Sequence, residues 1–501
     1  MAKQPPSFDR EKVYETVPQT GFFGNPKGLF TLFFTEFWER FSYYGMRAIL
    51  IYYMYYSVSE GGLGFEKSTA ASIMAVYGSL VYMSGILGGW IADRLLGTSR
   101  TVFYGGILIM FGHIVLALPG GATALFISMG LIIIGTGLLK PNVSNIVGDL
   151  YSRTDGRRDA GFSIFYMGIN MGAFLSPLIV GKVSEGGNFH LGFGLAAIGM
   201  FLGLLVFVLT KKKNLGQAGA YVPNPLLPEE RKKVLGRIAI GVVVVAALAF
   251  VSASIGILTL NSFTFLVSIL GILLPIAYFV VMYKSPKVTE DEKSRLLAYI
   301  PLFIAAMIFW AIQEQGAYVL SIFADEQTRL SLLGWELKAA YFQSVNPLFI
   351  IALAPVFASF WVRLGDHQPT TTRKFSFGLI FAGLSFIVMM FPGLLYGTDT
   401  LVSPMWLVAS FFLVVIGELF LSPVGLSATT KLAPAAFSAQ TMSLWFLTNA
   451  SAQAINAQIV KFYNDANQVM YFGVIGAVAI FFGLVLYLIA PRMQKYMRGV
   501  R

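Results

Sequence analysis

The chain has 501 residues, of which 56% are hydrophobic and only 12% charged, whereas soluble proteins carry about 25% charged residues. The composition therefore indicates an integral membrane protein, and the length suits a dozen or more helical spans of about 20 residues each. Cysteine is absent, which excludes disulfides and thiolate metal sites. The net charge is +11, but the basic residues lie in short loops between apolar segments, which argues against a nucleic-acid partner.

Fourteen apolar segments are predicted to be membrane-spanning helices, which makes the expected fold class an all-α integral membrane protein. They cover residues 28–57, 68–93, 101–120, 123–147, 160–182, 191–210, 238–260, 261–283, 296–324, 339–362, 375–396, 402–430, 435–460 and 466–490. The seventh and eighth spans carry no charge and are joined by a very short turn. Without this hairpin six spans remain on each side, which resembles the two six-helix bundles of major-facilitator transporters around a midplane site.

The spans predict five consecutive parts of the chain. They are a cytoplasmic tail 1–27, an N-terminal six-helix bundle 28–213, a linker with the extra two-helix hairpin 214–293, a C-terminal six-helix bundle 294–491 and a cytoplasmic tail 492–501. Lysine and arginine set the orientation, because the loops on one side hold only Lys67, Lys182, Arg329, Lys338 and Lys461. We therefore expect a multi-pass cell-membrane protein with both termini in the cytoplasm.

The first span carries four charges, Glu36, Glu39, Arg40 and Arg47. Each costs roughly 2.5–3.5 kcal/mol near the bilayer centre on insertion scales, so together they require pairing and access to water. On a helix these positions and Tyr43 fall within roughly 80° of arc. This stripe predicts one wall of a polar cavity; the alternative is a cluster that only locks neighbouring helices together.

The second span ends in the sequence GGWIADRLLGTSR, residues 88–100. This segment resembles the Gly-x-x-x-Asp-Arg-x-x-Gly loop of the major-facilitator superfamily. Asp93 and Arg94 are then expected to latch neighbouring helices on the cytoplasmic side. The alternative is that they are ordinary charges of a cytoplasmic loop.

Ionisable groups away from the span ends are few, and they are distributed unevenly. Besides the first span, Lys140 lies in the fourth, Glu314 in the ninth and Glu418 in the twelfth. The first six-span half therefore has an excess of cations and the second half has only acids. A cavity between them suits a zwitterion, with its carboxylate on Arg47 and Lys140 and its ammonium group on Glu418.

Two or three amino acids would fill a cavity about 10 Å wide, since an extended chain spans at most about 3.3–3.6 Å per residue. Asn170 and Asn346 could hydrogen-bond a peptide linkage. Amphipathic aromatic walls could come from Tyr43, Tyr44, Tyr82, Trp310 and Trp445. Plain packing is the alternative for each aromatic taken singly, although the tyrosines on the charged stripe favour the cavity.

The same acids suggest how transport is driven. Glu314 lies in an apolar span, where burial favours the neutral carboxylic acid, so it is a candidate proton carrier. The alternative is a buried hydrogen-bonding partner. We further hypothesise that Lys140 pairs with Glu36 or Glu39 beside Arg40, so that protonation of the glutamate frees the lysine for a substrate carboxylate.

Three motifs carry a resemblance that runs over essentially the whole chain. The run Glu-x-x-Glu-Arg-Phe-x-Tyr-Tyr-Gly from Glu36 to Gly45 resembles the hallmark of the proton-coupled oligopeptide transporter (POT/PTR) family. Residues 88–106 and 162–174, FSIFYMGINMGAF, resemble two further family segments. The extra hairpin resembles that of the bacterial members.

The resemblance implies symport of di- and tripeptides with protons into the cell. By motif position, Arg47 and Lys140 would bind the peptide carboxylate, Glu418 the amino terminus, and Glu314 a proton. Asn170 and Asn346 would contact the backbone, and Tyr44, Tyr82, Trp310 and Trp445 would line side-chain pockets. Animal members use a histidine in the second span, and residues 68–93 contain none, so coupling is expected to rest on glutamates.

The main alternative is a proton-coupled facilitator for another zwitterion or anion, of the nitrate or drug type. Glu418 argues for an amine-bearing ligand. A drug antiporter fits poorly with two cavity cations, and a channel would need polar residues on many spans. An intramembrane enzyme would need a nucleophile–base pair or residues spaced as metal ligands, and the sequence offers neither. We expect protons as the coupling ion, no other cofactor and function as a monomer.

Overall fold

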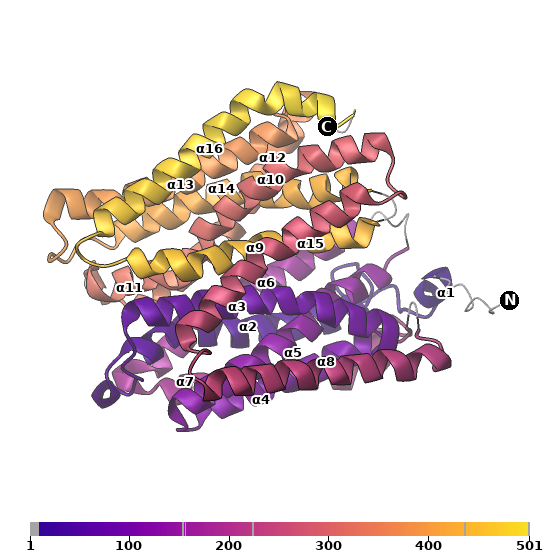
Figure 1. Ribbon diagram of the computed structural model, residues 1–501, viewed down its shortest axis with the longest axis horizontal. Helices are drawn as coiled ribbons and strands as arrows, with labels where there is room; N and C mark the ends of the chain where they lie inside the picture. The colour runs from indigo at the N-terminus through magenta and orange to yellow at the C-terminus, as the bar shows by residue number, and fades with distance from the viewer. Residues whose placement is uncertain (1–9, 153–154, 156, 223–224, 435–436, 499–501) are drawn as a thin grey trace. The chain divides into compact units, whose positions relative to one another are not determined.

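The computed structural model describes residues 10–152, 155, 157–222, 225–434 and 437–498 (Figure 1). A helix corresponds to each of the fourteen predicted spans, although the predicted start of the thirteenth, at residue 435, lies outside the described residues. The long helices are α2 (Gly28–Tyr55), α3 (Lys67–Ile91), α4 (Thr98–Ala117), α5 (Gly121–Asp149), α6 (Arg158–Val183), α7 (Phe189–Asn214), α8 (Pro228–Ser254), α9 (Leu260–Lys284), α10 (Glu290–Glu314), α12 (Val345–Leu364), α13 (Thr371–Tyr396), α14 (Met405–Leu432), α15 (Ser438–Ile459) and α16 (Gln468–Tyr496). Shorter elements are α1 (Arg10–Glu15), the π-helical turn η2 (Ala92–Leu96), α11 (Val319–Glu326), the 3₁₀ turns η4 (Gln315–Ala317) and η5 (Ala339–Ser344), and the hairpin of β1 (Ser331–Leu332) and β2 (Trp335–Glu336).

Within the described residues, 12 helical segments are long and apolar enough to cross a membrane by length and composition. Two of the predicted spans, α2 and α15, are not among them. Helix α2 contains the four charges of the first span, and α15 is rich in serine, threonine, asparagine and glutamine. Both helices thus have polar side chains at membrane depth, where such groups usually serve a function.

Glycines allow several helices to pack closely. A Cβ atom at Gly105 of α4 would lie 2.7 Å from the carbonyl oxygen of Gly135 on α5. A Cβ atom at Gly383 of α13 would likewise lie 2.6 Å from the carbonyl oxygen of Gly476 on α16. Any larger residue would push these backbones apart, as in small-residue helix contacts of other membrane proteins. The α13–α14 and α13–α16 pairs form the scaffold of the C-terminal helices (Figure 1).

The ninth span, predicted over 296–324, lies within a helical segment Glu290–Glu326 that is long and apolar enough to cross a membrane, but this segment is interrupted. Helix α10 ends at Glu314, η4 follows, and Tyr318 leaves helical geometry with φ −134° and ψ −60° before α11 begins. The carbonyl oxygen of Gly316 accepts hydrogen bonds from Gln343 Nε2 at 2.7 Å and Ser321 Oγ at 3.2 Å. Side chains thus satisfy backbone that the break exposes, a condition for irregular structure at membrane depth.

The chain packs into two compact units. The first unit comprises Met1–Glu39, Met83–Ile169 and Ala197–Val267, and the second comprises Arg40–Tyr82, Asn170–Ala196 and Ser268–Arg501. The predicted division at residues 27, 213, 293 and 491 stays a prediction.

The predicted linker after the sixth span is anchored within the first unit. Gly219 accepts a hydrogen bond from the backbone N–H of Ser99 at 2.8 Å, and the N–H of Leu226 bonds to the carbonyl oxygen of Arg94 at 3.2 Å. The guanidinium of Arg94 also lies 3.9 Å from the carboxylate of Glu230, in the first turn of α8. The loop that ends the second span therefore holds the linker in place, while the proposed latching role of Asp93 and Arg94 stays a prediction.

Candidate functional site

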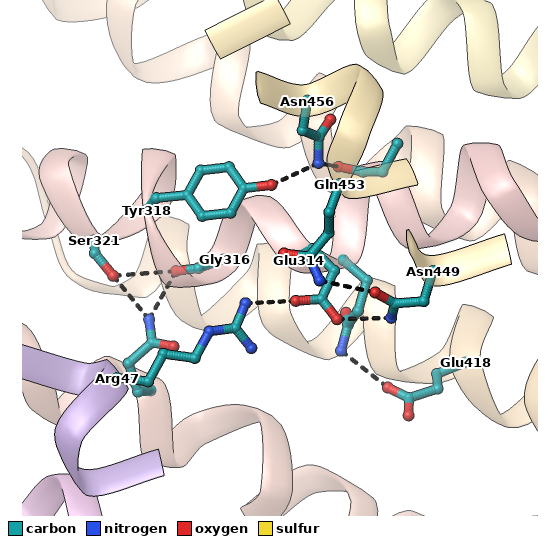
Figure 2. Close-up of polar contacts among 12 residues, drawn as sticks. Arg47, Glu314, Gly316, Tyr318, Ser321, Glu418, Asn449, Gln453 and Asn456 are labelled. Carbon is teal, nitrogen blue, oxygen red and sulfur yellow. Dashed lines mark hydrogen bonds and ion pairs between the residues drawn. The ribbon is translucent and has the colours of Figure 1, made fainter. Parts of the chain in front are cut away.

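An ion pair lies at the break in the ninth span, inside the second unit. Arg47 Nη2 of α2 donates to Glu314 Oε2 at 2.5 Å, and the side chains are only 11% and 8% exposed (Figure 2). Asn449 Nδ2 of α15 donates to the other carboxylate oxygen of Glu314 at 2.8 Å. Both oxygens of this buried acid are therefore engaged, one by a charge and one by a neutral amide.

Asparagine and glutamine side chains on α15 extend the network. Asn449, Gln453 and Asn456 lie at i, i+4 and i+7, on one face of the helix. Gln453 Nε2 donates to Asn449 Oδ1 at 2.9 Å, and Asn456 Nδ2 donates to the hydroxyl of Tyr318 at 2.6 Å (Figure 2). Gln315 Nε2 donates to Asn456 Oδ1 at 3.2 Å. This stripe fixes the η4 break against α15, and none of its members was predicted as a site residue.

A second carboxylate, that of Glu418, is bonded to Gln313, the residue directly before Glu314 on α10. Gln313 Nε2 donates to Glu418 Oε2 of α14 at 3.0 Å, and Glu418 is 9% exposed (Figure 2). Within the described part of the chain, Glu418 makes no ion pair. A buried carboxylate with an amide donor alone remains suited to accept a cationic group of a ligand.

The other predicted site residues of the second unit lie on its helices as expected from the sequence. Arg40 is buried with its guanidinium 5.0 Å from the ring centre of Tyr43 and 5.7 Å from that of Tyr44, within cation–π range. The remaining members are half-buried or buried: Tyr82 on α3, Asn170 on α6, Trp310 on α10, Asn346 on α12 and Trp445 on α15. Their contact with a ligand stays a prediction.

Trp445 shows how the sequence places one of these aromatic side chains. A Cβ atom built on Gly425 of α14 would lie 1.9 Å from the Trp445 ring. The indole can therefore occupy this position only because residue 425 lacks a side chain.

The first unit contains the rest of the predicted set. Glu36 and Glu39 on α2 are 3% and 0% exposed, and Lys140 on α5 is half-buried. Asp93 in η2 is exposed and Arg94 is half-buried. Pairing of Lys140 with either glutamate stays a prediction.

A second polar cluster joins the end of α2 to α11 in the second unit. The hydroxyls of Tyr55 and Tyr56 donate to the two oxygens of Asp325 at 2.5 and 2.8 Å. Close by in sequence, Lys67 of α3 forms an ion pair with Glu326. We call these residues the α11 clasp. Sequence reasoning missed it because Asp325 lies at a predicted span end, where charges are ordinary.

Comparisons with known proteins agree over the whole chain. The PTR2 model, which describes the POT family, matches residues 99–490. An uncharacterized transporter, YclF, of Bacillus subtilis (strain 168) is 62% identical over 494 residues, 99% of each chain. A di-/tripeptide transporter of Lactococcus lactis subsp. lactis (strain IL1403) is 48% identical over 488 residues, 96% of this chain and 98% of its own.

Solved structures give the same result. The crystal structure of a peptide transporter POT in complex with sulfate has a TM-score of 0.96 at 66% identity, covering 98% of this chain and 100% of its own. A POT family transporter in complex with 5-aminolevulinic acid has a TM-score of 0.93 at 50% identity, covering 96% and 99%. These similarities confirm the all-α membrane fold expected from the sequence.

Proposed function

The chain belongs to the POT family, and from this premise we propose that it imports di- and tripeptides together with protons by alternating access. Its fold is that of an all-α integral membrane protein of the major-facilitator type. The family is one of transporters, so the chain is a transporter, and we propose that it has no enzymatic activity. Peptide transport is supported by the similarity to the di-/tripeptide transporter of Lactococcus lactis and to peptide-transporter structures of the same fold.

The ion pair between Arg47 and Glu314 carries the proposed coupling mechanism. While Glu314 is ionised, it occupies the guanidinium of Arg47. A proton on Glu314 removes the charge attraction, and Asn449 can still donate to the neutral acid. Breaking one side of a buried pair costs about 3–5 kcal/mol because the other charge is left uncompensated. A peptide carboxylate that binds the freed Arg47 offsets this cost, so proton and peptide bind together.

The opposite end of the peptide is assigned to Glu418. Its carboxylate lacks an ion pair among the described residues and would accept the peptide ammonium group. Asn170 and Asn346 would bond the peptide backbone, and Tyr44, Tyr82, Trp310 and Trp445 would line the side-chain space. A nitrate-type substrate offers no cation for Glu418, which disfavours the alternative function.

The break between α10 and α11 is proposed to act as a hinge of the gate. Glu314 is the last residue of α10, and the α11 clasp holds the far side of the break. The excess of lysine and arginine in alternate loops supports the proposal that both termini lie in the cytoplasm. The α11 clasp would then lie at the outer end of the pathway. We propose that opening to the outside breaks the hydrogen bonds from Tyr55 and Tyr56 to Asp325. The protein is proposed to work as a monomer in the cell membrane.

Lys140 is proposed as a second cation for the peptide carboxylate, released when Glu36 or Glu39 takes a proton. Lys140→Ala is then expected to abolish proton-driven uptake of dialanine while sparing exchange of peptide for peptide. Both are measured in liposomes, with and without a pH gradient. Concentrative uptake at the wild-type level by this variant would remove Lys140 from the mechanism.

Purified protein in liposomes provides the direct test of the proposed function. Labelled dialanine is expected to accumulate only with an inward proton gradient, and unlabelled di- and tripeptides should compete with it. Nitrate and N-acetylated dialanine should not compete. Absence of gradient-dependent accumulation, with folding checked by thermal unfolding, would overturn the proposal.

A further inference from the structure

A cavity with a volume of about 910 Å³ lies among α12, α13, α14 and the end of α16, away from the ion pair described above. All of its lining residues belong to the second unit. They include two lysines, Lys374 in the first turn of α13 and Lys431 in the last turn of α14, and no carboxylate among the side chains that the structure describes. The described lining therefore brings two cationic side chains to the place where α13 begins and α14 ends.

The basic end also presents backbone donors. Thr370 caps α13 by accepting a bond from the N–H of Arg373, and Thr370 and Thr371 both line the cavity. The first N–H groups of a helix have no partners within the helix and carry a partial positive charge, which suits an anion. Two lysines and a helix N-terminus thus converge on one cavity.

Lys374 is held in position by its neighbours. Its ammonium group lies 4.1 Å from the ring centre of Trp361 and donates to Gln368 Oε1 at 2.7 Å. Neither contact neutralises its charge. An anionic ligand would therefore meet a preoriented cation, which lowers the entropy lost on binding.

Beyond the lysines the wall is apolar. Phe357 of α12 and Leu419, Pro423 and Val424 of α14 line this part, and the three α14 residues lie about two to three helical turns before Lys431. A free phosphate would leave this wall empty, and the described lining residues offer no acid for the amine of a zwitterionic peptide. A ligand with an anionic head and a hydrocarbon chain matches both parts of the cavity.

We propose that this cavity binds an anionic phospholipid, with the phosphate on Lys374, Lys431 and the N-terminus of α13 and an acyl chain along Phe357 and α14. Basic pockets between transmembrane helices on the cytoplasmic side bind such headgroups in other membrane proteins. The site is separate from peptide and proton binding, and its test does not depend on the proposed transport activity.

Native mass spectrometry of the full chain in an uncharged detergent tests the assignment, with dioleoylphosphatidylglycerol and dioleoylphosphatidylcholine as probes. The wild type is expected to bind the anionic lipid more tightly, and Lys374→Gln with Lys431→Gln to weaken it about 30-fold, since each lysine near a membrane surface contributes about fivefold. Binding of phosphatidylcholine should not change. Lys284→Gln with Lys287→Gln makes the same charge change outside the cavity and should have no effect.

Two further arms keep the test decisive. Lys374→Arg with Lys431→Arg should retain lipid binding. Ala358→Trp fills the cavity but leaves both lysines intact, and it should lose lipid binding. This variant tests the site independently of whether the double glutamine variant folds. Millimolar inorganic phosphate should not displace the lipid; complete displacement would make this a site for a free anion. Equal binding of both lipids, or wild-type lipid binding by the double glutamine variant, would overturn the proposal.

Discussion

Glu314→Gln is expected to abolish proton-driven accumulation of dialanine while exchange of peptide across the membrane continues. Glutamine has nearly the shape of the protonated acid but never ionises, so Arg47 stays available to the peptide carboxylate and no proton is released. For one proton per peptide, a gradient of about two pH units sustains at most about 100-fold accumulation. The variant should show a ratio near one.

The proposed role of Glu314 also predicts how uptake changes with the outside pH. Wild-type uptake should rise as the outside pH falls, because protonation of Glu314 frees Arg47. Exchange by Glu314→Gln should be independent of pH. Glu290→Gln is the matched control, since Glu290 lies on the same helix but is exposed and pairs with Lys293. Accumulation by the Glu314 variant at wild-type levels would exclude Glu314 as the coupling acid.

The positions of the helices were predictable from the sequence because the hydropathy of a span and the charges of its flanking loops depend only on short stretches of residues. The sequence also predicted α2 and α15 as spans, although they are not among the helices that are apolar enough by composition alone. The break after Glu314 was not. It depends on Gln343 and Ser321 bonding the carbonyl oxygen of Gly316, and nothing in the run QEQGAY reveals these partners.

The ionisable residues of the site were predictable, but their pairing was not. Arg47 and Glu314 are 267 positions apart, and the sequence suggested opposite walls rather than a direct ion pair. The amides of α15 were missed for a different reason. Asn449, Gln453 and Asn456 form a polar stripe at helical spacing within a predicted span, but a search for charges alone passes over them.

Glu418→Gln is expected to weaken binding of dialanine at least about 30-fold and to remove the preference for a free amino terminus. Truncating one partner of a buried charge pair costs about 2–5 kcal/mol, which is about 30-fold at the lower limit. The carboxamide can still bond Gln313 but cannot neutralise the peptide ammonium group. The measurement is competition against labelled dialanine by unlabelled dialanine and by N-acetyldialanine.

The ratio of the two competitors makes the result specific to the amino terminus. The wild type should discriminate strongly against the acetylated peptide, and the variant should treat both alike, whatever its yield or turnover. Glu336→Gln, in the exposed hairpin, changes the same charge in the same unit and should retain the wild-type ratio. In the proposed mechanism Glu314 is protonated when the peptide is bound, so it cannot replace Glu418 as a negative charge opposite the peptide ammonium group. A Glu418 variant that still prefers the free amine would therefore place the peptide ammonium group elsewhere.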